Sequence, residues 1–268
     1  MIKTNYIKVV FIILFLFVLL MYLLNPIKVI TNFIYLAIPL VPVIVSYKVQ
    51  KIYGKGNVHS KAVKLIFIGF VFNFLTELTA AIFRYYNIVY EFLSPSYIFT
   101  ALADIFLFIG VVYELRNYKI TIKPVYKYIL YIFSIIVFAV MFVYLGNWQY
   151  PIWQNIINVS FTYCSYLFVV MIALIAAMVR EFRNGKLFYP WRYIAIGASV
   201  MFLGGIMLAL FAHQYRMGVG FYFIATDTIW SVGYLTLGYG LFLLGDTIEE
   251  TREKVFAKFN FMNKLKNL

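Results

Sequence analysis

Three acidic residues lie inside long apolar runs of the sequence, where an ionisable side chain is least expected without a function. They are Glu77, Asp104 and Asp227. Placing an ionisable side chain at membrane depth costs about 2.5 kcal/mol or more, so each such residue is a functional candidate. Carboxyl groups there can hold a cationic or hydrogen-bonding ligand, titrate during transport, or divide acid and base roles in an enzyme acting on lipids.

Other polar residues repeat at helical spacing around these acids. Asn73 and Arg84 fall on the helix face of Glu77, and Trp230 and Tyr234 follow Asp227 in the same way. The candidate ligand-binding residues are Glu77, Asp104, Asp227, Arg84, Asn73, Asn158, Trp230 and Tyr234, with His213 and Arg216 at the outer rim.

Motifs for metal, nucleotide or redox chemistry are not found in the sequence. His59 is assigned to a cytoplasmic loop and His213 to the opposite side, so no spacing suits a metal, and no phosphate-binding glycine loop occurs. The single cysteine, Cys164, cannot form an intramolecular disulfide and is interpreted as a small apolar helix residue. We therefore expect neither a metal nor a cofactor.

The composition decides which solvent surrounds the elements that carry these residues. Of 268 residues, 64% are apolar and 12% are charged, and the mean hydropathy is +0.88. A soluble domain is closer to half apolar and a quarter charged. These values exclude a soluble fold, a disordered chain and a free-standing nucleic-acid binder, and they predict an all-α bundle of transmembrane helices.

Eight apolar runs are long enough to span a bilayer, which takes about 20 helical residues. Only Asn25 and Pro26 separate the first two runs, so the number of spans is seven if those two form one bent element. The predicted spans are 7–24, 27–47, 64–84, 97–115, 126–145, 156–179, 191–212 and 223–245.

Basic residues predict the orientation, because cytoplasmic segments hold the Lys and Arg excess. With eight spans and both termini inside, 20 of the 23 basic residues fall on the cytoplasmic side, and the net charge is +13. Residues 1–246 would then form the bundle, in a cell membrane. Residues 247–268 would form a basic amphipathic tail against anionic lipid headgroups. This tail would begin with a new helical turn that Asp246 or Thr247 caps.

The three acids share one depth in this topology. At 1.5 Å per residue, each lies roughly 6–11 Å below the outer boundary. We expect a polar, outward-opening cavity between the third, fourth, sixth and eighth spans. The structural alternative stays open, because polar membrane residues also form hydrogen bonds that merely join helices, worth about 0.6 kcal/mol each.

The last span and its exit resemble the final span of multi-pass sensor modules that precede histidine-kinase or other signalling domains in archaea and bacteria. The resemblance covers about 30 residues and rests on Trp230-Ser231-Val232-Gly233-Tyr234-Leu235, Gly238-Tyr239-Gly240-Leu241 and Glu249-Glu250-Thr251-Arg252-Glu253. It implies a membrane input module that binds a small ligand. Since these 268 residues hold no output domain, a separate signalling partner or a second copy of the chain would receive the signal.

Three other functions are compatible with the same pattern. They are a secondary transporter, in which Glu77 or Asp104 would couple transport to protons, a lipid-modifying membrane enzyme, and a structural subunit of a membrane complex. An enzyme is the less favoured class, because no catalytic motif accompanies the acids.

Overall fold

The computed structural model describes residues 2–24, 28–54, 56–86, 88, 94–118, 124–146, 148, 151–182, 186–211, 215 and 220–266. Within these residues all regular secondary structure is helical. The helices are α1 (Ile2–Leu24), α2 (Lys28–Tyr35), α3 (Ala37–Tyr53), α4 (Val58–Tyr85), α5 (Pro95–Asn117), α6 (Pro124–Leu145), α7 (Ile152–Phe182), α8 (Phe188–Leu210) and α10 (Phe221–Lys266).

The chain is a multi-pass helical membrane protein by the length and apolar character of its helices. Six helical segments of the described chain qualify as membrane spans: residues 32–53, α4, α5, residues 152–180 of α7, α8 and residues 221–254 of α10. In α1 and α6 the apolar stretches are shorter, Val9–Met21 and Tyr131–Leu145. Large apolar side chains such as Leu16 and Ile135 point away from the bundle, as a lipid-facing surface requires.

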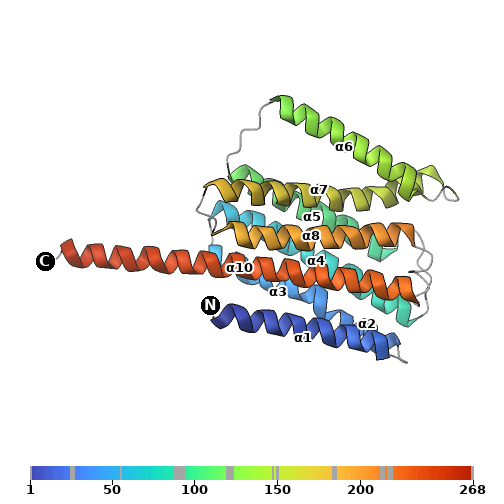
Figure 1. Cartoon of the computed structure of the whole chain (residues 1–268), viewed down its shortest axis with the longest axis horizontal. Helices are drawn as coiled ribbons and strands as arrows, with labels where there is room; N and C mark the ends of the chain where they lie inside the picture. Colours follow the sequence, from blue (N-terminus) through green and yellow to red (C-terminus); the bar gives the residue numbers. More distant parts are fainter. Residues whose placement is uncertain are drawn as a thin grey trace.

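The first two predicted spans are separate helices. α1 ends at Leu24, and the chain then reverses so that α2 and α3 run back alongside it (Figure 1). Pro42 lies inside α3 and cannot donate a backbone hydrogen bond. The Ser46 hydroxyl donates to the Pro42 carbonyl over 2.6 Å, which satisfies a polar group inside the apolar helix.

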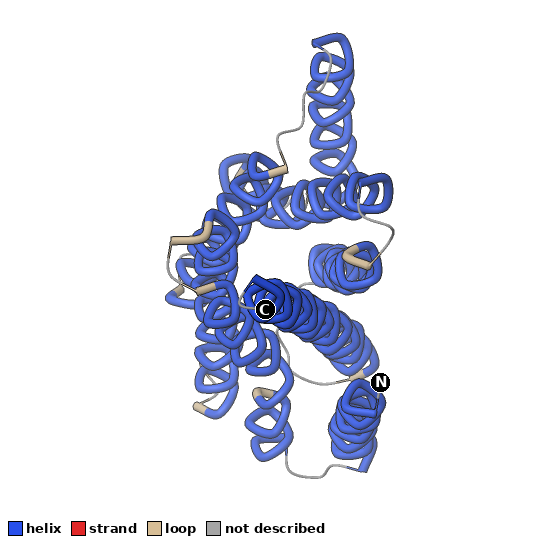
Figure 2. The backbone as a smooth tube through the Cα atoms, turned by 90° about the vertical axis from the view of Figure 1, so that its left-hand side faces the viewer, coloured by secondary structure: helices blue, strands red, loops and turns tan. Residues whose placement is uncertain are grey.

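The last helix, α10, is the central element of the bundle. It packs mainly on α8 and α3, and Figure 2 shows other helices on several of its sides. Two glycines allow α8 and α10 to approach closely. A Cβ on Gly197 would lie 2.5 Å from the Leu237 backbone nitrogen, and one on Gly240 would lie 2.6 Å from that of Ile194.

α10 continues past the bundle as one helix. Its C-terminal end projects beyond the other helices (Figure 1). The Thr247 and Thr251 hydroxyls donate to the carbonyls of Leu243 and Thr247, four residues earlier, and Lys254 pairs with Glu250. The new turn expected at Asp246 or Thr247 is therefore interior to α10. The side chains beyond residue 254, with the predicted amphipathic face, lie outside the described residues.

We call the two ends of the bundle the cluster end and the tail end. The cluster end is where α4 ends at Tyr85 and α10 begins at Phe221. The tail end is where α4 begins at Val58 and where α10 leaves the bundle.

Candidate functional site

Seven polar side chains meet at the cluster end and are called the polar cluster. They come from α2, α4, α10 and the segment between α8 and α10: Asn32, Asn73, Glu77, Arg84, Tyr215, Asp227 and Tyr234. Because Asn73, Glu77 and Arg84 are separated by whole numbers of helical turns, α4 presents all three to α10. Five of the seven were in the predicted set: Asn73, Glu77, Arg84, Asp227 and Tyr234.

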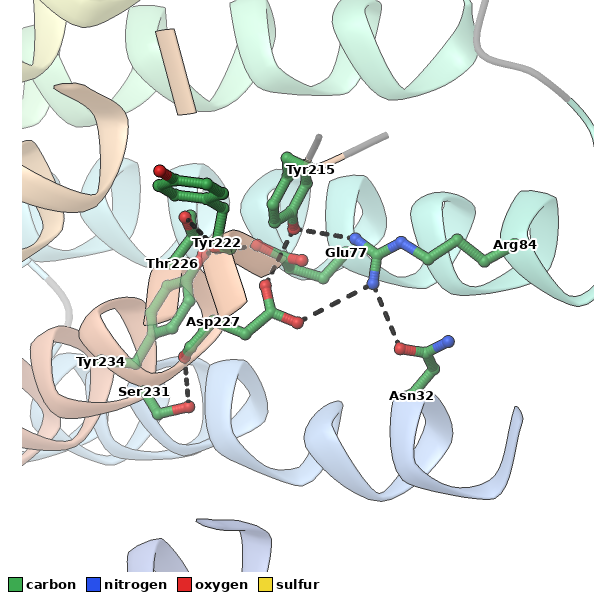
Figure 3. Close-up of polar contacts among 9 residues, drawn as sticks. All are labelled: Asn32, Glu77, Arg84, Tyr215, Tyr222, Thr226, Asp227, Ser231 and Tyr234. Carbon is green, nitrogen blue, oxygen red and sulfur yellow. Dashed lines mark hydrogen bonds and ion pairs between the residues drawn. The ribbon is translucent and has the colours of Figure 1, made fainter. Parts of the chain in front are cut away.

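Arg84 is the centre of one half of the cluster. Its Nη1 donates to Asn32 Oδ1 over 3.2 Å, and its Nη2 donates to the Tyr215 hydroxyl over 2.8 Å. Nη1 also lies 3.9 Å from Asp227 Oδ2, at the limit of an ion pair. The Tyr215 hydroxyl in turn donates to Asp227 Oδ1 over 2.9 Å, so the tyrosine completes the link between cation and anion (Figure 3).

Aromatic rings close the space around the guanidinium. Arg84 Cζ lies 4.9 Å from the Phe223 ring centroid and 5.2 Å from that of Tyr215. Cation–π contacts of this kind strengthen when water is excluded. Arg84 is thus held on several sides by polar and aromatic groups.

Glu77 anchors the other half of the cluster. The Tyr234 hydroxyl lies 3.0 Å from Asn73 Oδ1 and 3.3 Å from Glu77 Oε1, so it can donate to either acceptor. Tyr234 and Asp227 are two helical turns apart on α10, which aims both toward α4. The two halves are therefore joined through α10 itself.

The charged side chains of the polar cluster are buried within the described part of the chain, whereas an outward-opening cavity was expected at this place. Asp227 is 0% exposed, Glu77 is 6% exposed, and the Arg84 side chain is 9% exposed. Each of these side chains contacts another member of the cluster. The cluster holds two carboxyl groups and one guanidinium, so its formal charges do not balance when both acids are ionised.

Neighbouring residues on α10 support the cluster without joining it. The Thr226 hydroxyl donates to the Tyr222 carbonyl over 2.8 Å, and the Ser231 hydroxyl donates to the Asp227 carbonyl over 2.7 Å. Trp230 was a predicted ligand-binding residue. Its indole nitrogen donates to the Met201 carbonyl of α8 over 3.3 Å, and its ring packs edge-on against Tyr215, 5.7 Å between centroids.

Two predicted residues lie away from the cluster. Asp104 is on α5, and its Oδ2 is buried with no hydrogen-bond partner within the described part of the chain. Asn158 is half-buried on α7. The polar cluster draws on α2, α4, α10 and the segment that holds Tyr215, and it does not include the residues predicted on the fourth and sixth spans.

The predicted rim residues His213 and Arg216 lie outside the described residues. Tyr215 lies between them in the chain and belongs to the described residues. It is 7% exposed and central to the cluster. The sequence offered little to single it out among 24 tyrosines. Asn32 was also missed, although a polar residue within an apolar run was the signal used for the acids.

A second buried polar contact occupies the tail end. His59 Nδ1 lies 2.8 Å from Glu114 Oε1 and 3.0 Å from Oε2, and the Glu114 side chain is 1% exposed. The Asn117 amide donates to Glu114 Oε2 over 3.4 Å, and the Tyr53 ring stacks on His59. His59 was expected in a loop, but it belongs to the first turn of α4, where the Asn57 side chain accepts from its backbone nitrogen.

The chemistry available to these sites is hydrogen bonding and charge pairing. Among the described residues, no three His, Cys, Asp or Glu side chains come together in a way that suits a metal ion. Comparison of the chain with models of protein families, with curated proteins and with solved structures gives no match.

Proposed function

We propose that this chain is a membrane sensor in which a small cationic or hydrogen-bonding ligand acts on the polar cluster and α10 carries the response to the opposite face. One observation carries the proposal. The helix that supplies Asp227 and Tyr234 to the cluster continues without a break to Lys266, beyond the rest of the bundle.

The charge content of the cluster supports a cationic ligand. Glu77 and Asp227 share one guanidinium, and a second positive charge would balance the pair. Breaking a buried charge pair is strongly unfavourable, so a ligand that supplies charge and hydrogen bonds can change which arrangement of α4 and α10 is preferred. The Arg84–Asp227 separation of 3.9 Å is the contact most easily exchanged, because it is the longest in the cluster.

Close packing supports transmission along the bundle. With glycines at the α8–α10 contact, backbone meets side chain without space between, so a displacement of α10 at the cluster end must be accommodated by α8 or carried along α10. In this proposal the cluster end faces outward and the tail end faces the cytoplasm, following the 20 basic residues assigned there. A separate partner or a second copy would contact the projecting part of α10.

The ligand test uses the full chain in nanodiscs of neutral phosphatidylcholine. We expect at least one compound from a panel of polyamines, quaternary amines and amino-acid amides to raise the thermal midpoint by several degrees. The shift should disappear in Glu77→Gln and persist in Glu250→Gln, an exposed acid at the tail end. A midpoint that no compound moves, or one that moves equally in Glu77→Gln, would contradict the proposal.

The relay is tested by distance measurement between spin labels. Cys164→Ala removes the single cysteine, and labels are placed at Asn57 and Thr251, which are exposed near the tail end. The active compound should change the distance distribution between the labels. An unchanged distribution with a bound ligand would exclude α10 as the transmitting element.

A proton-coupled transporter is the second candidate, and Asp104 favours it. A buried carboxyl oxygen with no hydrogen-bond partner in the described residues is suited to taking up a proton or a cation. Solute uptake into proteoliposomes driven by a pH gradient, and lost in Asp104→Asn, would rank this function above the sensor.

A further inference from the structure

A cavity of about 870 Å³ lies between α7 and α8, at the end where α7 finishes and α8 begins. It is separate from the polar cluster, since none of its lining residues belongs to that cluster. The lining is Ala173, Ala176, Ala177, Arg180, Phe188, Arg192, Ala195, Ile196, Ser199 and Val200.

Two arginines from facing helices mark the cavity at one end. Arg180 is in the last turns of α7 and Arg192 is in the second turn of α8, and both are exposed. Arg180 Cζ lies 5.8 Å from the Phe188 ring centroid, a contact that restrains the side chain. Among the described residues, neither guanidinium forms an ion pair with an acid. Two such guanidiniums on one cavity favour an anion, and the planar donor fork suits phosphate.

The remaining lining is almost entirely apolar and extends away from the arginines. From Arg180 to Ala173 the α7 side covers about 10 Å of helix, and from Arg192 to Val200 the α8 side covers about 12 Å. Small alanine side chains leave the space open, and Ile196 on the wall is 42% exposed. The cavity is thus charged at one end and apolar along its length.

The neighbouring helix leaves this region uncovered. α6 contacts α7 near Ser134 and Tyr163, then leans away from α7 toward the end where Arg180 lies (Figure 1). The apolar part of the cavity is therefore reachable from the lipid-facing side, between two membrane-spanning helices. A soluble anion would contact only the two arginines and leave that apolar length unfilled.

We propose that this groove binds one anionic phospholipid, with the phosphate between Arg180 and Arg192 and an acyl chain along Ala173, Ala177 and Val200. The charge at the end and the apolar lining match the two parts of one lipid molecule. The site is independent of the ligand proposed for the polar cluster.

The test counts lipids retained by the delipidated full-length protein in native mass spectrometry. Dioleoyl phosphatidylglycerol and dioleoyl phosphatidylcholine are added separately. We expect one phosphatidylglycerol to be retained at least tenfold more tightly than phosphatidylcholine. The Arg180→Gln, Arg192→Gln double variant should lose this preference. The matched control is Arg116→Gln with Arg252→Gln, two exposed arginines outside the groove, and it should keep it.

A second variant separates a lipid from a free phosphate ligand. Ala177→Phe fills the apolar part of the groove and should abolish phosphatidylglycerol retention without changing the arginines. sn-Glycerol 3-phosphate, which has the phosphate but no acyl chain, should not displace the lipid at millimolar concentration. Equal retention of the two lipids by the unmodified protein would overturn the proposal. So would displacement by sn-glycerol 3-phosphate, or equal losses in the control variant.

Discussion

The Tyr215 hydroxyl lies 2.9 Å from Asp227 Oδ1 and donates a hydrogen bond to it, although Tyr215 is outside every predicted span. The Tyr215 hydroxyl oxygen also accepts a hydrogen bond from Arg84 Nη2 over 2.8 Å. A tyrosine in a connecting segment therefore completes a buried link between α4 and α10. The order of the cluster depends on this segment as well as on the two helices.

Removing the Tyr215 hydroxyl should destabilise the bundle. Tyr215→Phe leaves the ring in place but deprives a buried arginine and a buried carboxylate of one partner each. We expect the free energy of unfolding to fall by about 1–3 kcal/mol, measured by thermal or denaturant unfolding in detergent. Tyr222→Phe is the control. Its side chain is about one-third exposed, and the change should have little effect. Similar losses in the two variants would refute the special role of Tyr215.

The two acids of the cluster should respond differently to neutralisation. Asp227→Asn removes the one carboxylate that lies within ion-pair distance of Arg84 and that accepts the Tyr215 hydrogen bond, so we expect a loss of about 3–5 kcal/mol. Glu77→Gln keeps an acceptor for the Tyr234 hydroxyl and removes the surplus negative charge. It should leave the stability within about 1 kcal/mol. Parallel unfolding curves for the two variants check this order, and a larger loss from Glu77→Gln would contradict the charge argument.

The contact between His59 and Glu114 should show measurable coupling. His59→Ala leaves the buried Glu114 carboxyl with the weaker Asn117 contact and should cost about 1–3 kcal/mol. Glu114→Gln in the same chain should recover part of that loss. A double-mutant cycle isolates the coupling energy of the pair. Strictly additive effects of the two substitutions would show that the 2.8 Å contact contributes no stability.

Alanine substitutions at two glycines of α8 should have very different effects on stability. A Cβ on Gly197 would lie 2.5 Å from the Leu237 nitrogen, so Gly197→Ala should force α8 and α10 apart and cost about 1–3 kcal/mol. Gly205 has only Thr162 Cγ2 nearby, at 3.9 Å. Gly205→Ala should be neutral or stabilising by up to about 1 kcal/mol, because alanine favours helix. Thermal midpoints compare the two, and equal midpoints would argue against close α8–α10 packing.

The sequence was sufficient to predict the helices and part of the polar cluster. Apolar run length is a local property, and six of the eight predicted runs lie wholly within single helices of the described chain. The run 27–47 is divided between α2 and α3, and the run 191–212 continues past the end of α8 at Leu210. Helical periodicity also placed Glu77 and Arg84 on one face of α4. These features depend on solvent and helix geometry, which act within a single run of residues.

The predicted depth of the acidic residues in the membrane was not enough to predict which of them lie close together. Asp104 was predicted at the same depth as Glu77 and Asp227, but it lies outside the polar cluster, because each helix also has a rotation about its axis that only packing determines. The same reason explains why Glu114 was missed. It stands at the end of an apolar run, and the fold brings His59, distant in sequence, against it.

The +13 charge, the apolar composition and the helical runs are thus properties that the sequence by itself determined. Only the tertiary structure decided that Tyr215 links Arg84 to Asp227, that Glu77 and Asp227 are buried together, and that α7 and α8 line a groove ending in two arginines. Those contacts join residues far apart in the chain. Their formation depends on how the helices rotate and pack together, and no single segment carries that information.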